Sequence, residues 1–91
     1  MNATIFSHNI DALARIATLF ITFFGYSDDR EISAAVALAT KSAVIEWYES
    51  NGMTIDFYNE KIDPDALEYA GLKLLELKEM ADAAASLVGK A

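Results

Sequence analysis

The side chains that could carry out chemistry in this chain are mainly carboxylates at helical spacing. Glu46 and Glu49 stand three residues apart, and Glu79 and Asp82 repeat that spacing later in the chain. Residues three apart lie on the same face of a helix, so each pair presents two carboxylates side by side. This is the only pattern in the sequence that indicates an enzyme.

The two acidic pairs resemble the paired motifs of the MazG-like, all-α nucleotide pyrophosphohydrolases, in which such carboxylates hold magnesium against a triphosphate. The resemblance covers only Glu46–Glu49 and Glu79–Asp82, and the intervening residues 50–78 form a longer spacing than that family usually shows. If the two helices are antiparallel neighbours, a rise of ~1.5 Å per residue offsets the pairs by roughly 16 Å. A magnesium-dependent nucleotide hydrolase is therefore a less favoured alternative, and we assign no catalytic residue, cofactor or metal.

Other catalytic and ligand-binding patterns are missing from the sequence. The single histidine, His8, has Asp11 one turn away but no serine motif nearby, which is typical of a surface or helix-capping histidine. The four glycines are isolated and form no phosphate-binding loop. The absence of cysteine excludes disulfides and thiolate metal sites. We therefore predict a protein without enzymatic activity.

Negative charge is concentrated in one part of the chain. The net charge is −7, and residues 46–68 contribute −6 of it, because seven acids there face Lys61 alone. Nucleic acid and anionic membranes are not expected as direct ligands, whereas a basic protein would be attracted. Aromatic side chains lie in the same stretch and could belong either to the core or to an interface. The predicted partner-binding residues are Glu46, Trp47, Glu49, Asp56, Phe57, Tyr58, Glu60, Asp65 and Glu68.

The apolar periodicity predicts a first helix at residues 8–25, capped by Ser7 and terminated by Gly25. Its polar residues form one narrow stripe, which leaves a wide apolar face. A face that wide contacts more than one neighbour. A second helix is expected at residues 28–50, beginning at Ser27 and ending before Asn51 and Gly52.

The third helix, at residues 64–88, has the clearest start, with Asp63 as the N-cap and Pro64 at the first helical position. An apolar seam repeats along it every seven residues, which is typical of a helix that pairs with another at a shallow angle. The seam consists of Leu67, Ala70, Leu74, Leu77, Ala81, Ala84 and Val88.

Residues 53–62 are ambiguous. Their alternation of apolar and polar residues suits a short strand, and the spacing of Ile55, Tyr58 and Ile62 suits one or two helical turns. A lone strand has no partner within this chain, so it would require pairing across an oligomer. We expect a loop with a short helix.

Composition indicates that the domain does not bury all of its apolar surface alone. Residues 1–91 form a single domain, and 54% of them are hydrophobic, above the usual ~45–50%. A small domain can hide only roughly 60–65% of its unfolded surface. We therefore expect a homo-oligomer whose interface includes Phe20, Phe23, Phe24, Leu74 and Leu77.

The predicted fold is all-α, a small bundle of three long helices with room for a fourth short one, completed by oligomerisation. The predicted function is a self-associating protein–protein interaction or adaptor module, with an acidic inhibitor of another protein's basic nucleic-acid-binding site as the alternative. The amino terminus carries no basic signal region, and the longest uncharged run is too short to span a bilayer. We therefore expect a cytoplasmic protein that binds no membrane.

Overall fold

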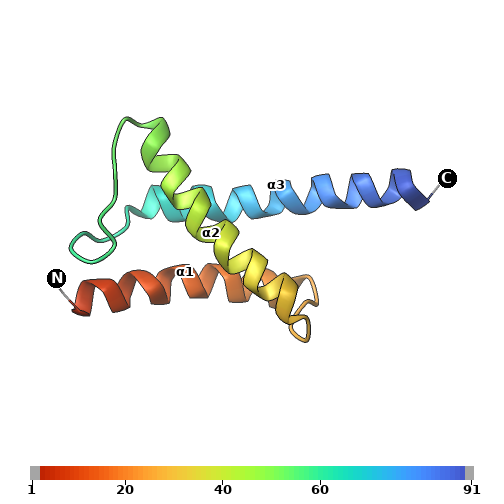
Figure 1. Ribbon diagram of the computed structural model, residues 1–91, viewed down its shortest axis with the longest axis horizontal. Helices are drawn as coiled ribbons and strands as arrows, with labels where there is room; N and C mark the ends of the chain where they lie inside the picture. The colour runs from red at the N-terminus through yellow and green to blue at the C-terminus, as the bar shows by residue number, and fades with distance from the viewer. Residues whose placement is uncertain (1–2, 90–91) are drawn as a thin grey trace.

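The computed structural model describes residues 3–89 and consists, over that range, of three helices without a strand. Helix α1 spans Ala3–Phe23, α2 spans Arg30–Ser50 and α3 spans Pro64–Gly89. Helices α1 and α3 run in the same direction, and α2 crosses them on its way back (Figure 1). The predicted all-α fold of three long helices is confirmed. Within the described range, no helix combines the length and the apolar composition that a membrane crossing requires.

Two glycines end the first two helices as predicted. Gly25 has a φ of 77°, and the N–H groups of Gly25 and Tyr26 donate to the carbonyls of Thr22 and Ile21. These two bonds define a Schellman motif, whose left-handed residue favours glycine because it has no Cβ. Gly52, with a φ of 69°, closes α2 with the same pair of bonds.

The starts of α1 and α2 differ from the predictions. Helix α1 begins at Ala3, so Ser7 lies inside it and does not cap it. The N-cap of α2 is Asp29, whose side chain accepts the N–H of Ile32 at 3.0 Å, and not Ser27. Ser27 belongs to the turn that follows α1, in which the Asp29 N–H donates to the carbonyl of residue 26. The turn delays the second helix by two residues.

The start of α3 is as predicted, and the segment before it is not helical. The Oδ1 atom of Asp63 accepts the N–H of Asp65 at 2.9 Å, and Pro64 is the first helical residue. Residues 53–62 form neither a strand nor a helix, so the short helix expected there is absent. Hydrogen bonds with Asn9 on α1, and not regular secondary structure, fix the position of this segment.

The core is small and is divided between two clusters. The first cluster joins all three helices near the segment 53–62, and the second lies around Ala17, Val36 and Leu74. The chain exposes 6337 Å², about 20% more than the ~5200 Å² expected for a compact monomer of 10.0 kDa. Its radius of gyration of 14.7 Å exceeds the ~12 Å expected for this length. The structure is therefore extended, and its longest dimension is 52 Å.

Candidate association surfaces

The second half of α3 projects beyond the other two helices. The last buried residue of α3 is Leu74, and all residues from Glu79 to Val88 are exposed. The turn after α1 reaches Lys78, whose Nζ lies 5.3 Å from the ring centroid of Phe24. Beyond that level, α3 continues alone (Figure 1). The projecting half accounts for much of the elongation of the molecule.

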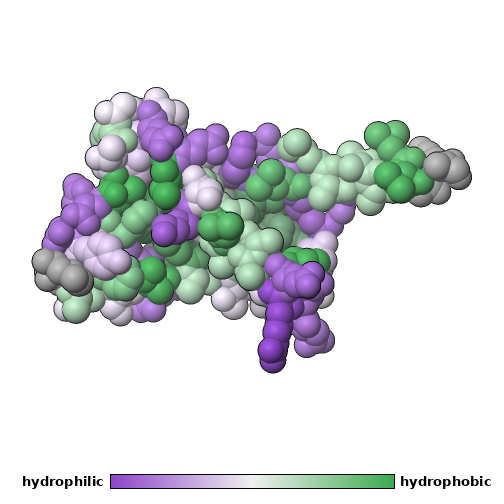
Figure 2. Space-filling view, viewed as in Figure 1, coloured by the Kyte–Doolittle hydropathy of each residue, from purple (hydrophilic) through white to green (hydrophobic). Residues whose placement is uncertain are grey.

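The apolar stripe of α3 does not stop where the bundle stops. Ala66, Ala70 and Leu74 bury the first half of the stripe inside the chain. The same helical face continues into the second half, where its members are uncovered. Its exposed side chains are the predicted seam residues Leu77, Ala81, Ala84 and Val88, flanked by Met80 and Leu87. Figure 2 shows this projecting end as a largely apolar surface.

An apolar groove lies between the second half of α1 and the middle of α3. Its volume is about 490 Å³, and its lining is almost entirely aliphatic and aromatic. The residues that line it are Ile16, Leu19, Phe20, Phe23, Phe24, Gly71, Leu74 and Leu75. A second apolar groove, of about 300 Å³, lies between the start of α2 and the middle of α3. Phe20 and Leu74 line both grooves, so the two grooves are neighbours.

The structure brings the predicted association residues together around these grooves. Phe23 is 81% exposed and Leu77 is 40% exposed, so both have surface that another chain could cover. Phe20 and Phe24 are partly buried, with ring centroids 4.8 Å apart. Leu74 is only 3% exposed, and it lies in the core of its own chain. Leu74 therefore supports the groove from beneath and has little surface left to bury.

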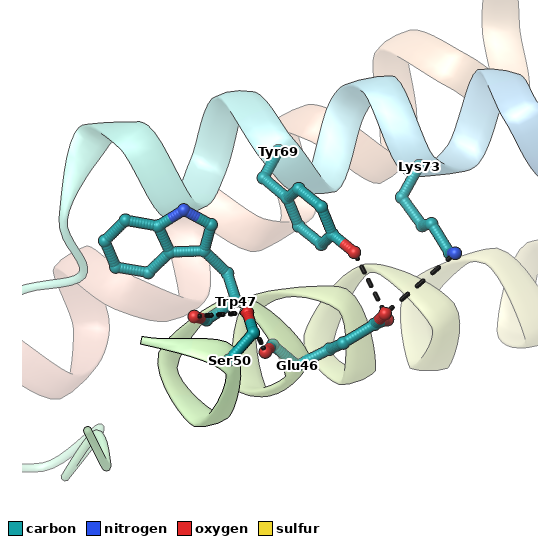
Figure 3. Close-up of polar contacts among 5 residues, drawn as sticks. All are labelled: Glu46, Trp47, Ser50, Tyr69 and Lys73. Atoms are coloured by element: carbon teal, nitrogen blue, oxygen red, sulfur yellow. Dashed lines mark hydrogen bonds and ion pairs between the residues drawn. The ribbon is translucent and has the colours of Figure 1, made fainter. Parts of the chain in front are cut away.

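Glu46 joins α2 to α3 instead of facing solvent alone. Its Oε1 accepts the hydroxyl of Tyr69 at 2.9 Å and lies 4.0 Å from the Nζ of Lys73 (Figure 3). The hydrogen bond to this carboxylate raises the pKa of Tyr69 above its usual value, with a smaller contribution from desolvation. At the end of α2, the hydroxyl of Ser50 donates to the carbonyls of Glu46 and Trp47 (Figure 3).

Asp56 and Glu60 organise the loop in which they lie. The carboxylate of Asp56 accepts the N–H of Tyr58 at 3.0 Å and the side-chain amide of Asn59 at 2.8 Å. These bonds, that from Asn59 first, hold the pKa of Asp56 below its usual value. The carboxylate of Glu60 accepts the Asp56 N–H at 3.0 Å. Both predicted partner-binding acids thus have structural roles in this turn.

The loop is fixed to α1 by Asn9, a residue that sequence reasoning missed. Asn9 is fully buried, and its amide nitrogen donates to the carbonyls of Phe57 at 2.9 Å and Glu60 at 2.7 Å. Its amide oxygen accepts the N–H of Ile62 at 3.1 Å. The signal for this role was the position of Asn9 outside the polar stripe of α1, among apolar residues.

The aromatic residues near the acids contribute mainly to the fold. Tyr48 is 8% exposed, and its hydroxyl accepts the N–H of Asp63 at the start of α3, at 2.8 Å. Phe57 packs against the first core cluster, as do Trp47 and Tyr69. Tyr58 is 46% exposed and stacks on Phe6 with ring centroids 4.5 Å apart. Of the predicted aromatic partner residues, Tyr58 therefore offers the most accessible surface.

The acidic residues of α3 line its outer face. At about 100° per residue, they fall on the side of the helix opposite the apolar stripe. All of them are exposed: Asp65, Glu68, Glu76, Glu79 and Asp82. Glu49, at the end of α2, is also exposed. The acidic surface thus extends further along α3 than the stretch singled out in the sequence, because helical phase aligns acids that are distant in the chain.

The two acidic pairs do not converge into a metal site within the chain. Glu46 faces Lys73 on α3, whereas Glu79 lies six residues, or about 9 Å, further along that helix. Asp82 is paired with Lys78, and the hydrogen bond between them raises the pKa of Lys78. Among residues 3–89, no three acidic or histidine side chains are grouped closely enough to hold a metal ion.

Comparison of this chain with protein families, with curated proteins and with solved structures found no match.

Proposed function

We propose that this protein is a self-associating helical interaction module whose interface is centred on the projecting half of α3. The observation that carries the proposal is the apolar stripe that continues past the ends of α1 and α2. Met80, Leu87 and Val88 on this half are 61–77% exposed. Contiguous exposed apolar surface of this kind marks sites of protein association.

The size of the uncovered surface fits this function. The chain exposes about 1100 Å² more than a compact monomer of its mass. A protein–protein interface of standard size covers ~800 Å² of each partner. Pairing through the projecting half and the adjacent grooves would therefore bring the exposed surface of each chain close to the usual range.

Light scattering tests the proposal directly. At tens of micromolar, we expect a particle of at least twice the 10.0 kDa chain mass. Replacing Val88 with Asp should raise the dissociation constant more than tenfold, because Val88 lies on the stripe itself and burial of an unpaired carboxylate costs several kcal/mol. The matched control is Ser86→Asp, which places the same residue two positions away on the outer face and should leave association unchanged. A wild-type particle of 10 kDa would refute the proposal.

The acidic outer face of α3 supports a second surface, for a basic partner protein. Asp65 and Glu68 are exposed, and neither side chain forms an ion pair with another residue of the described range. The negative electrostatic potential of this acidic face would speed the approach of a cationic protein at low salt. Such a partner could be one whose basic nucleic-acid-binding site this chain occupies as an inhibitor.

A lysine homopolymer is a suitable probe for the acidic face. We expect Glu68→Lys combined with Glu79→Lys to weaken its binding at low salt, with little difference from wild type at high salt. Asp56→Lys and Glu60→Lys would be poor tests, because those acids hold the loop together. Equal binding of the polymer by the wild type and the double variant at low salt would exclude this face as a binding site for basic partners.

A further inference from the structure

We infer that the projecting half of α3 packs against the same segment of a second copy, antiparallel, about a two-fold axis between Asp82 and Ala83. The inference rests on the proposed self-association and adds its direction and register. Symmetric pairs of identical chains are the commonest oligomers, and their interface places the same surface on both partners. The uncovered stripe of α3 has a pattern that suits this symmetry.

The order of side-chain sizes along the stripe is nearly the same from either end. It has larger residues at its ends, Leu77 and Val88, and small ones at its centre, Ala81 and Ala84. Antiparallel pairing about the proposed axis puts Leu77 opposite Val88 of the partner and Ala81 opposite Ala84 of the partner. The alanines allow the helix axes to approach to about 8 Å, and the larger side chains close the two ends.

The charges of the segment are compatible with this pairing. At about 100° per residue, Glu79 lies roughly 180° from the centre of the stripe, and Glu76 and Asp82 lie roughly 120° from it on either side, so none of the three faces the second copy directly. Asp82 is also neutralised by Lys78 within its own chain. Like charges therefore do not meet across the axis, and the acidic outer faces stay in solvent.

The positions of α1 and α2 beside α3 favour antiparallel pairing over parallel pairing. In a parallel pair, the α1 and α2 helices of both chains would have to occupy one region, because they already cover Ala66, Ala70 and Leu74. In the antiparallel pair, the two bundles lie at opposite ends.

Disulfide trapping tests the register of the pair, and no native cysteine can form a competing disulfide because the chain contains none. Leu77→Cys and Val88→Cys chains are oxidised separately and as a mixture, with light scattering on each reduced sample. Only the mixture should yield linked dimers, identified by mass spectrometry of the joined peptides. Two copies of residue 77 would lie about 16 Å apart along the pair, which is beyond disulfide reach. The control mixture, Glu79→Cys with Ser86→Cys, has the same register on the outer face and should remain unlinked.

The outcomes separate this inference from the proposed function. Linked dimers from either variant alone would indicate a parallel pair and overturn the inference while preserving self-association. A mixture that is dimeric by light scattering but forms no link would show that the chains associate through another surface. A monomeric wild-type protein would refute both the antiparallel pairing and the proposed self-association.

Discussion

Replacing Asn9 with alanine is expected to destabilise the fold more than any exposed substitution. The side chain is fully buried and forms three hydrogen bonds to the backbone of residues 57–62. Each such bond contributes about 1 kcal/mol net, and a buried N–H left without a partner costs about 1–3 kcal/mol more. The N–H of Ile62 would be such a group. The expected loss is therefore about 4–6 kcal/mol, a large part of the ~5–15 kcal/mol that stabilises a typical domain.

Urea unfolding followed by far-ultraviolet circular dichroism measures this loss. All samples should have the same protein concentration, because self-association raises apparent stability by mass action. In thermal unfolding, the midpoint should fall by roughly 15–50 °C, at about 4–8 °C per kcal/mol for a domain of this size. Asn59→Ala is the matched control, since it removes one exposed hydrogen bond in the same loop and should cost under about 1 kcal/mol. A loss below about 1 kcal/mol for Asn9→Ala would refute the role assigned to Asn9.

Two further predictions concern the glycines and the acidic loop. Gly52→Ala should destabilise by about 1–2 kcal/mol because its φ is 69°, whereas Gly71→Ala, inside α3 and with open space around the added Cβ, should stabilise by about 0.5–1 kcal/mol. Urea titrations that gave both changes the same sign would contradict the conformational argument. The pKa of Asp56 lies below its usual value, so its contribution to stability is present above the unfolded pKa and is lost as the pH falls through the folded pKa. Asn59→Ala should raise the Asp56 pKa toward its usual value in an NMR titration, and an unchanged pKa would show that this hydrogen bond is not its cause.

The acidic stretch illustrates why a cluster in the sequence is not yet a surface. Residues 46–68 hold most of the net charge, and the sequence suggested one acidic face there. In the structure, Glu46 bridges two helices, Asp56 and Glu60 hold a turn, and Asp63 caps α3. Which carboxylates find internal partners depends on contacts between residues far apart in the chain, so composition alone could not predict it.

The ends of α1 and α2, the start of α3 and the apolar seam of α3 were determined by the sequence itself. Gly25, Gly52 and the Asp63–Pro64 pair act through bonds to residues at most five positions away, so their effect can be predicted from neighbouring residues. The seam follows from the period of the helix and needs no tertiary information. The start of α2 was misplaced by two residues because the turn after α1 competes for the same segment.

Only the tertiary structure decided which part of the seam is covered. The point where α1 and α2 leave α3 depends on the angle at which they pack and on the loop that Asn9 anchors. These contacts join residues 48–53 positions apart, and no local pattern encodes them. The sequence therefore determined that α3 carries a long apolar face, and the packing of the other helices left its second half exposed.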